Sequence, residues 1–282
     1  MASTRDIRRR IKSVKNTAQI TKAMQMVAAS KMRRAQQAAL AGRPYSELMN
    51  QVLASLKQRV DPRLHPLLAA RPVQRRCVLL LSTDKGLCGG LNTNLMREAA
   101  KFDAGTTAYI TWGRKARQFI ARTKRNLLAD FEQKETPTYA EGRAVGKMLT
   151  ELYLEGEIDQ IDILFTHYIS TLRQEPQTRQ LLPIVQWGVE TKGDIELTEP
   201  EFEPAADVLL ETVLPQYINM QVYQLMLESK ASEHSARMVA MKNATDNAKE
   251  LIDDLTLTYN KIRQAGITKE LLEITTAQMA LE

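Results

Sequence analysis

The sequence predicts an α/β fold: a central doubly wound, Rossmann-like sheet domain, flanked by N- and C-terminal helices that form a long antiparallel coiled coil. Three observations support this prediction. The first 41 residues contain no glycine and no proline, so nothing in them interrupts a helix. The middle of the chain alternates between short apolar runs and helical stretches, as a mostly parallel sheet does. The last stretch repeats the apolar spacing of the first.

The N-terminal stretch, Ile7 to Leu40, has one face at alternating three- and four-residue steps, the spacing of a coiled coil. That seam is weak, because alanine, threonine and glutamine stand where leucine is expected. Such a helix needs a partner of similar length. We expect it to bend near Gly42 and to continue to about residue 60, so that residues 1–60 form the first domain. The predicted seam consists of Ile7, Ile11, Val14, Ala18, Thr21, Gln25, Ala28, Met32, Ala35 and Ala39.

The middle of the chain, residues 73–190, is the predicted α/β domain. Continuous apolar or β-branched runs predict strands, and the stretches between them predict helices. The expected strands are Cys77 to Leu81, Thr107 to Trp112 and Ile161 to Ile169, with a further one at Thr178 to Val185. The expected helices are Leu91 to Phe102, Arg114 to Thr123 and Tyr139 to Leu154. The sheet would have four or five strands.

An acidic connection, Gly188 to Pro204, precedes the last predicted element, residues 205–282. That element contains one proline, Pro215, and one glycine, Gly266. At ~1.5 Å per residue an unbroken helix of this length would extend roughly 110 Å and project beyond its own domain. Its predicted seam is Met241, Ala244, Ala248, Leu251, Leu255, Thr258, Ile262 and Ala265. We therefore expect the two terminal helices to pair with each other as an antiparallel coiled coil, because each is the only partner of similar length that the sequence offers the other.

Charge is unevenly distributed in this chain. The net charge is +6, and residues 5–34 contain ten Lys or Arg and one acid, Asp6. A helix of this kind can bind nucleic acid, serve as a cleaved organellar transit peptide, or present a solvated basic face to an acidic protein partner. The helical pattern runs past residue 40, which disfavours a transit peptide. One face of residues 28–39, which carries Ala28, Met32, Ala35 and Ala39, is small and apolar, and this favours helix packing over nucleic-acid binding.

The apolar runs, cysteines and histidines give further limits on where this protein is located and what it binds. No apolar run approaches the ~20 residues that cross a bilayer. Cys77 and Cys88 have neither metal-ligand spacing nor a disulfide pattern, so a reducing cytosol is expected. His65, His167 and His234 are isolated from one another in sequence. We expect no metal site and no cofactor.

The motif Ser82 to Asn92, STDKGLCGGLN, follows a predicted strand and opens a predicted helix, where a phosphate loop would lie. It matches neither the dinucleotide fingerprint nor the P-loop, and we interpret it as a tight turn that needs glycine. Asp84, Lys85 and Cys88 have no histidine or second carboxylate nearby in sequence to complete a catalytic cluster. The prediction is a protein without catalytic residues. An enzyme that uses this turn stays an alternative.

Four stretches together resemble the gamma subunit of F-type ATP synthase. Ile20 to Arg33, ITKAMQMVAASKMR, is similar to the N-terminal signature of that family, and the glycine turn is similar to its first strand-turn-helix. Glu233 to Asn247 and Tyr259 to Glu273 are similar to its C-terminal helix. The matches cover essentially the whole chain. One departure is Ala277-Gln278, where the family usually has Gly-Ala.

The resemblance implies a central rotor shaft that couples ion-driven rotation of a membrane ring to conformational changes of the catalytic ring, for ATP synthesis or, in reverse, hydrolysis. The implied partners are the alpha and beta subunits, the epsilon subunit and the membrane c ring, with no nucleic acid and no active site on the shaft. The implied location is peripheral, on the cytoplasmic face of the bacterial plasma membrane. The coupling ion, H⁺ or Na⁺, is a property of the membrane ring.

The resemblance also implies residue roles. Motif matching implies ring contacts for Lys22, Met24, Arg237, Gln264, Thr268 and Glu270, and contacts in the foot of the shaft for Phe202 and Glu203. Some photosynthetic members carry a cysteine-bearing regulatory insertion before the last helix. The acidic connection here contains no cysteine, so we expect no thiol switch of that kind. A basic coiled-coil protein that binds nucleic acid through residues 5–34 is the alternative function.

Overall fold

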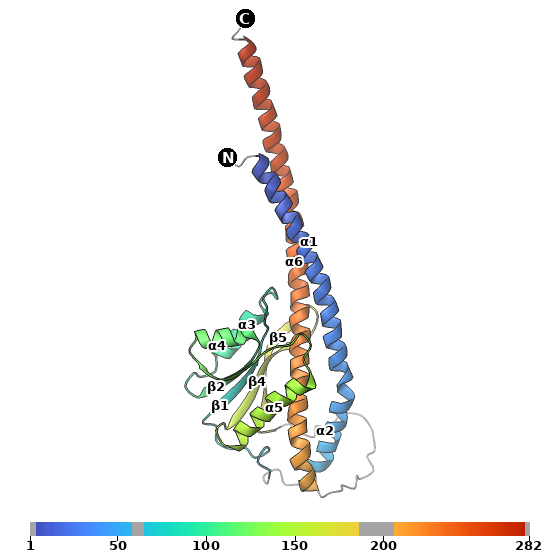
Figure 1. Ribbon diagram of the computed structural model, residues 1–282, viewed down its shortest axis with the longest axis vertical. Coiled ribbons are helices and arrows are strands. Elements are labelled where there is room, and N and C mark those ends of the chain that lie inside the picture. Colours follow the sequence, from blue (N-terminus) through green and yellow to red (C-terminus); the bar gives the residue numbers. More distant parts are fainter. Residues whose placement is uncertain (1–3, 58–64, 186–205, 280–282) are drawn as a thin grey trace. The chain divides into compact units, whose positions relative to one another are not determined.

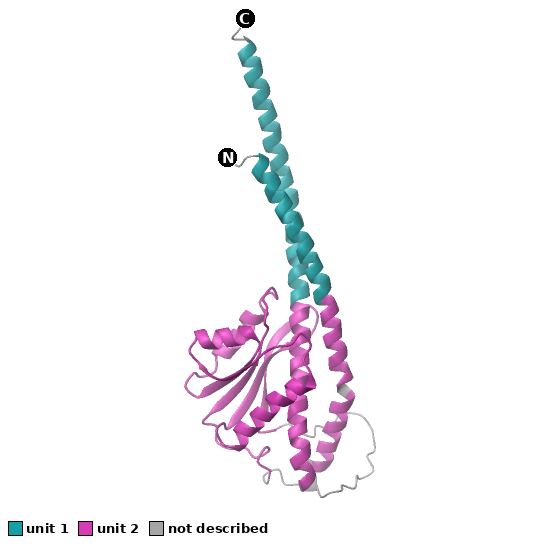
Figure 2. Ribbon diagram, viewed as in Figure 1, with its two compact units in different colours: residues 1–28, 237–282 teal, residues 29–236 magenta. Residues whose placement is uncertain are grey.

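The computed structural model describes residues 4–57, 65–185 and 206–279 of the 282-residue chain. Its helices are α1 (Thr4–Ala41), α2 (Arg43–Lys57), α3 (Leu91–Ala100), α4 (Arg114–Arg122), α5 (Tyr139–Leu154) and α6 (Ala206–Met279) (Figure 1). Its strands are β1 (Arg76–Leu81), β2 (Thr107–Trp112), β3 (Asn126–Phe131), β4 (Gln160–Tyr168) and β5 (Gln174–Leu182). The chain divides into two compact units (Figure 2). Unit 1 is Met1–Ala28 with Arg237–Glu282, and unit 2 is Ala29–Ala236.

Unit 1 is an antiparallel pair of helices, made by the first part of α1 and the last part of α6 (Figure 1). The seam predicted for α1 is confirmed, because none of its ten positions is exposed. Ile7, Thr21 and Ala28 are its most buried members within this unit. Their spacing matches the coiled-coil period, so the apolar stripe of α1 meets its partner along the whole of unit 1.

The seam predicted for α6 is partly wrong. Its first row is buried or half-buried as expected, and this row consists of Met241, Ala248, Leu255 and Ile262. The other four predicted positions lie mostly outside the contact between the helices. Leu251, Thr258 and Ala265 are exposed, and only Ala244 is half-buried. The contact is made instead by Thr245, Ile252 and Tyr259. A helix has 3.6 residues per turn, so steps of three and of four from the first row are both close to its face. Which of these positions is buried depends on where α1 packs against α6.

Unit 2 contains a five-stranded sheet in the order β3-β2-β1-β4-β5. Strands β1 to β4 are parallel, and β5 runs antiparallel to β4. This confirms the predicted doubly wound sheet. The strand at Thr107–Trp112 has the predicted bounds, and the strand predicted at Thr178 to Val185 lies earlier, as β5. Strand β3 was not identified from the sequence.

The two faces of the sheet carry separate apolar cores, which follow the two-residue alternation of strands. From β1, Cys77, Leu79 and Leu81 point into the larger core, which also takes residues of α2, α5 and α6. Val78 and Leu80 point into the smaller core, which α3 and α4 cover. Strand β1 is therefore buried on both faces, as its continuous apolar run predicted.

As predicted, the first helix is interrupted at Gly42 and helical structure resumes after it. Helix α1 ends at Ala41 and α2 begins at Arg43. The backbone nevertheless keeps helical hydrogen bonds across the junction, since the Gly42 N–H donates to Ala38 O at 3.3 Å and the Ser46 N–H to Gly42 O at 3.1 Å. A Cβ at Gly42 would lie 3.2 Å from Gln224 Oε1, so α6 approaches the junction closely.

Candidate functional site

The strand order of the sheet reverses between β1 and β4, and ligands of doubly wound sheets bind at the carboxyl ends of the strands at such a point. The turn Ser82 to Asn92 lies there, directly after β1. Thr83 Oγ1 donates to Lys85 O at 2.8 Å, and Asn92 Nδ2 donates to Thr83 Oγ1 at 2.8 Å. Leu87 and Gly89 adopt left-handed backbone angles, with φ of 61° and 60°. These hydrogen bonds within the turn agree with the tight-turn interpretation. The expected need for glycine holds only at Gly89, because Gly86 and Gly90 do not have positive φ and Leu87 does.

The chemically active side chains of this turn are also engaged. Asp84 Oδ1 accepts the N–H of Arg114 at 2.9 Å, which joins the turn to the start of α4. Cys88 is buried, and its Sγ accepts from Asn92 Nδ2 at 3.2 Å. Within the described ranges, no group of three or more His, Cys, Asp or Glu side chains is arranged to hold a metal ion. The turn therefore shows structural contacts and no assembled catalytic group.

Helix α6 covers the carboxyl ends of the neighbouring strands with polar side chains. Ser232 Oγ donates to Thr166 O, in β4, at 2.8 Å. Glu228 Oε1 accepts the backbone N–H of Tyr168 at 3.3 Å and also contacts His167 Nδ1. This polar stretch of α6 occupies the place beside β4 where a doubly wound sheet would otherwise receive a ligand.

A compact ion cluster lies beside this stretch. Lys230 and Glu233 pair at 3.1 Å although both side chains are almost fully buried. Lys31, in α1, pairs with Glu135 at 2.7 Å. The hydrogen bond and charge of Lys31 lower the pKa of Glu135, and His234 and Lys230 add smaller effects. The space among these residues is about 20 Å³, too small for a ligand. The cluster joins α1, α6 and the loop between β3 and α5.

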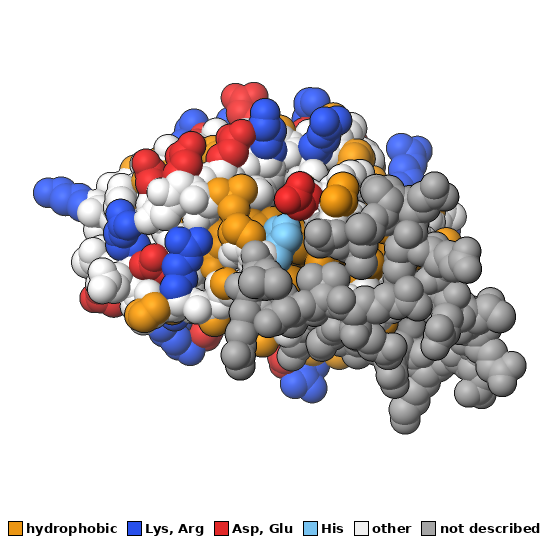
Figure 3. Space-filling view, turned by 90° about the horizontal axis from the view of Figure 1, so that it is seen from below, with side chains coloured by type: hydrophobic (Ala, Val, Ile, Leu, Met, Phe, Trp, Pro, Cys, Tyr) orange, Lys and Arg blue, Asp and Glu red, His pale blue; other side chains and the backbone are white. Residues whose placement is uncertain are grey.

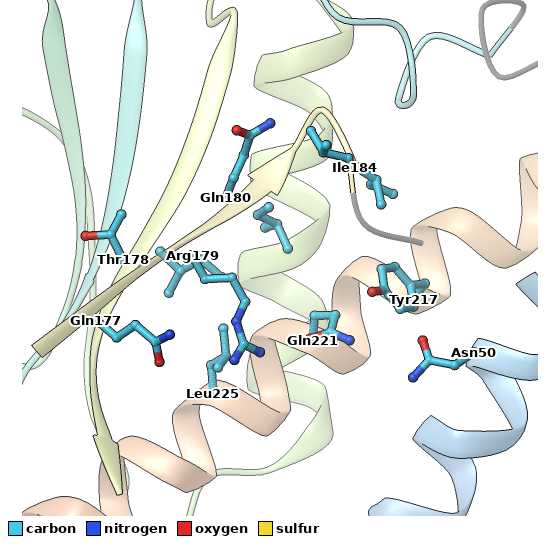
Figure 4. A pocket seen from close by; sticks show the side chains of 12 residues that line it. Asn50, Gln177, Thr178, Arg179, Gln180, Ile184, Tyr217, Gln221 and Leu225 are labelled. Atoms are coloured by element: carbon cyan, nitrogen blue, oxygen red, sulfur yellow. The ribbon is translucent and has the colours of Figure 1, made fainter. Parts of the chain in front are cut away.

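Two larger hollows of unit 2 lack catalytic pairs among their lining residues. The first, about 550 Å³, lies between β5, α6 and α2 (Figure 4). Its polar lining is mostly amides, with Arg179 and Tyr217, and burial raises the pKa of Tyr217. The second, about 530 Å³, lies at the start of β1 and β2. Its Arg76 is paired with Asp162 at 3.5 Å. Neither lining contains a histidine. In the second hollow, Thr106 Oγ1 donates to Asp103 Oδ2 at 2.8 Å, and the Thr106 N–H donates to the same oxygen at 3.0 Å, so this contact closes a turn.

The residues expected to contact a ring all belong to unit 1. Lys22, Gln264, Thr268 and Glu270 are exposed, whereas Met24 and Arg237 are half-buried. Gln264 and Thr268 are one helical turn apart, since Thr268 Oγ1 donates to Gln264 O at 3.0 Å. The remaining members are spread along the two helices, so they form no single pocket. Phe202 and Glu203 lie outside the described residues.

Sequence reasoning missed the exposed apolar side chains of unit 1. Every residue from 263 to 278 is exposed, and so are several large apolar residues of α1. The exposed apolar side chains of the two helices include Ile20, Met26, Val27, Ile267, Leu271, Leu272 and Ile274. The signal was available, because the seam of α1 begins at Ile7 and leaves the end of a longer α6 without a matching stretch. Apolar side chains exposed in this number indicate a protein partner.

Charge accompanies these apolar side chains on unit 1. Arg8, Arg9, Arg10, Lys12 and Lys15 are all exposed on α1. The face of the molecule seen from below shows a different mixture, with apolar side chains among scattered basic and acidic ones (Figure 3). Among the helices of the described residues, none is both long and apolar enough to span a bilayer. Unit 1 thus presents an extended basic and apolar surface rather than a pocket.

Comparison with known proteins gives consistent matches over the full length. The family model described as ATP synthase matches residues 3–281. The chain is 51% identical to the ATP synthase gamma chain of Methylacidiphilum infernorum over an alignment of 292 positions that covers 100% of both chains. It is 51% identical to that of Opitutus terrae, with 99% of each chain covered, and 45% identical to that of Desulfitobacterium hafniense, with 100% of each covered.

Solved structures agree in fold. A chain of the mitochondrial ATP synthase rotor of Euglena gracilis superposes with a TM-score of 0.70 at 19% identity, covering 94% of this chain and 98% of that one. A central-stalk chain of the Tetrahymena thermophila enzyme superposes with a TM-score of 0.61 at 23% identity, covering 80% of this chain and 99% of that one. None of these matches supports the alternative of a nucleic-acid-binding protein.

Proposed function

Because this chain belongs to the family of ATP synthase gamma chains, we propose that it is the central rotor shaft of an F-type ATP synthase. It couples ion-driven rotation of a membrane ring to conformational changes of a catalytic ring of alpha and beta subunits, and works in reverse during hydrolysis. The observation that carries this proposal is the 51% identity to a gamma chain along the whole of both chains.

The surface of unit 1 suits a shaft that must turn. A rotating element passes successive partners, so its contacts have to be weak enough to exchange. Exposed Met26 adapts to changing neighbours, because its side chain is flexible and polarizable. The exposed basic side chains of α1 act over longer range and with looser geometry than packed apolar contacts. Apolar residues near the end of α6, such as Leu271 and Ile274, become buried in the surrounding ring.

Six residues are proposed to touch that ring, on the strength of their motif positions and their place in unit 1: Lys22, Met24, Arg237, Gln264, Thr268 and Glu270. Phe202 and Glu203 are proposed to belong to the foot, where the shaft meets the epsilon subunit and the c ring. A non-catalytic role follows from the family, and the described residues are consistent with it: the turn after β1 is closed by its own hydrogen bonds, and α6 covers the end of β4. ATP is made and hydrolysed on partner subunits.

The complex is membrane-associated, and this chain is peripheral to the membrane through its partners. Its relatives come from bacteria, which supports a position on the cytoplasmic face of the plasma membrane. Membrane vesicles that carry the assembled complex, with the catalytic ring outward, test this arrangement. A protease added to such vesicles should reach unit 2, whereas vesicles of the opposite orientation should protect it.

Substitution in the assembled complex tests the coupling role. Arg237→Ala or Gln264→Ala should lower the rate of ATP synthesis several-fold, because each removes a polar contact between shaft and ring. The matched control is Arg122→Ala, an exposed arginine at the end of α4 in unit 2, which should leave the rate unchanged. The purified chain alone should hydrolyse no ATP. Wild-type rates in both unit 1 variants would remove these residues from the interface.

A further inference from the structure

A pair of buried threonines lies within the seam of unit 1. Thr21, in α1, is 9% exposed, and Thr245, in α6, is 3% exposed. Their hydroxyl oxygens are 2.7 Å apart, a hydrogen bond between residues 224 positions apart in the chain. Other deeply buried residues of this seam, such as Ala28, Met241 and Ala248, are apolar. The pair places a directional contact among contacts that have no preferred direction.

The hydroxyls form a short chain of hydrogen bonds. Each threonine hydroxyl has one proton to donate. Thr245 Oγ1 lies 2.8 Å from Met241 O and donates to it. Its lone pairs then accept the proton of Thr21 Oγ1, for which the alternative acceptor, Ala18 O, is more distant at 3.1 Å. The hydrogen bond between the helices forms only when the two threonines lie at the same height along the helix axes, because the oxygen–oxygen distance of such a bond is normally about 2.5–3.0 Å.

Close to the threonine pair, several seam positions are alanines: Ala18 and Ala28 in α1, and Ala244 and Ala248 in α6. Alanine side chains are small and present nearly the same surface at successive positions, so at this level of the seam a shifted pairing loses little contact. The apolar attraction between helices is non-directional and depends on buried area. A buried polar residue in an otherwise apolar seam is the device by which coiled coils specify alignment, at some expense in stability.

We propose that Thr21 and Thr245 are positioning residues that fix the axial and rotational alignment of the two helices of unit 1. This inference rests on the proposed function: a two-helix shaft transmits rotation only if its helices do not slide past each other under load. The hydroxyl pair resists that sliding at one level of the seam. The apolar residues on either side supply the attraction that keeps the helices together.

The alignment is measured as a distance in the full-length chain. Spin labels are attached at Lys12→Cys and Asn243→Cys, two exposed positions of unit 1 on different helices, after the buried Cys77 and Cys88 are replaced by alanine. The unaltered threonine pair should give one narrow distance distribution. The Thr21→Val/Thr245→Val variant should broaden or shift it by more than ~1.5 Å, the rise of one helical residue. Its unfolding temperature should hold or rise, because valine keeps the shape and adds apolar surface.

Two control variants separate the hydroxyl from general effects of substitution. Thr21→Ser/Thr245→Ser keeps both hydroxyls and should restore the narrow distribution. Thr17→Val/Thr256→Val removes two exposed threonine hydroxyls that bond only within their own helices, to Ser13 O at 3.1 Å and Ile252 O at 2.7 Å, and should leave the distribution narrow. A narrow distribution in the buried valine variant would overturn the proposal. So would an equal broadening in either control variant.

The same variants in the assembled complex measure the consequence. The ratio of ATP-driven ion pumping to ATP hydrolysis should fall in the buried valine variant and recover in the serine variant. An unchanged ratio, despite a broadened distance distribution, would overturn the link to transmission. The spin-label distance is measured on the chain alone, so it tests the alignment of the two helices even if the chain does not act as a rotor shaft.

Discussion

Single side chains at the carboxyl edge of the sheet join elements that are far apart in sequence. Ser82 Oγ accepts the N–H of Ala116 at 2.8 Å, at the start of α4, and Ser82 O accepts from Gln133 Nε2 at 2.9 Å. A Cβ at Gly113 would lie 2.8 Å from Ser82 O, so this close approach requires glycine. At the scale of the residue, the polar groups of Ser82 and Gln133 at this edge of the sheet therefore form structural hydrogen bonds between neighbouring loops and α4.

His65 gives a pH-dependent contribution to stability. Its Nδ1 accepts the backbone N–H of Leu67 at 3.2 Å, so the folded chain requires that nitrogen unprotonated. Burial lowers the pKa of His65, and Glu211 partly offsets this by raising it. With a folded pKa below the unfolded value of ~6.5, the contribution is complete above that value and is lost as the pH falls through the folded pKa. Acidification from neutral pH should therefore lower the unfolding temperature.

The His65→Asn variant isolates this contribution. Asparagine Oδ1 can accept the same backbone N–H two residues on, as in an Asx-turn, but it does not titrate. Thermal unfolding of the variant and the wild-type chain should agree near pH 8 and diverge toward pH 5.5, with the wild-type chain losing more. Parallel curves for the two proteins over this interval would show that His65 has no such role.

At the scale of the element, the crossing of α5 and α6 in unit 2 depends on two glycines. A Cβ at Gly146 would lie 2.2 Å from Asn219 Oδ1 and 3.2 Å from Asn219 Cα. A Cβ at Gly142, one turn earlier, would lie 2.7 Å from Tyr223 Cβ. Because Asn219 and Tyr223 are themselves one turn apart on α6, the two helices meet in successive layers with no room for a methyl group at either glycine.

Gly146→Ala should therefore lower the free energy of unfolding by about 1–3 kcal/mol, the usual range for overpacking. Gly266→Ala provides the opposite case, because nothing lies within 4 Å of the added Cβ in the last part of α6. There the same substitution should raise helix stability by ~0.5–1 kcal/mol, since alanine is the better helix former. Circular dichroism during denaturation measures both. A shift of the same sign in the two variants would contradict this view of the crossing.

Prediction from sequence succeeded where one face of an element was clearly apolar. Strand β1 has a continuous apolar run, and the bounds of β2 and α5 were predicted to the residue. Strand β3 was missed because its residues alternate between exposed and half-buried and include an aspartate, Asp130, so its apolar signal is weak. Asp130 is held by Thr111 Oγ1 at 2.8 Å, a contact between strands that no local pattern reveals.

The paired helices show a second limit of sequence reasoning. In α1 the seam was predicted correctly from the three- and four-residue spacing that begins at Ile7, although Ile20, Met26 and Val27 lie outside it and are exposed. In α6, the apolar Leu251 suggested a seam position that is exposed in the structure. The buried Thr245 makes a polar contact instead, and a hydrophobic pattern cannot predict such a contact. The candidate site was limited in a similar way. The motif residues fall in unit 1, and the greater length of α6 indicates an unpaired end, but the exposure of every side chain from 263 to 278 was established only by the structure.

At the scale of the whole molecule, both the polar interior of unit 2 and the surface of unit 1 agree with a non-catalytic role. In the interior of unit 2, Lys230 and Glu233 pair with each other while both side chains are almost fully buried, and at the surface Lys31 pairs with Glu135. It leaves basic and apolar side chains outward on unit 1. Full-length similarity to gamma chains assigns the family, and the exposed surface explains why the chain needs a surrounding assembly.

Rotation of this chain within the assembled complex tests the central claim most directly. The complex is fixed to a surface through its beta subunits, and a bead is attached to this chain at Arg122→Cys, an exposed position of unit 2. On addition of ATP, the bead should turn continuously in one direction, and it should stop when ATP hydrolysis is inhibited. A bead that stays still while the same complexes hydrolyse ATP would contradict the assignment of this chain as the rotor shaft.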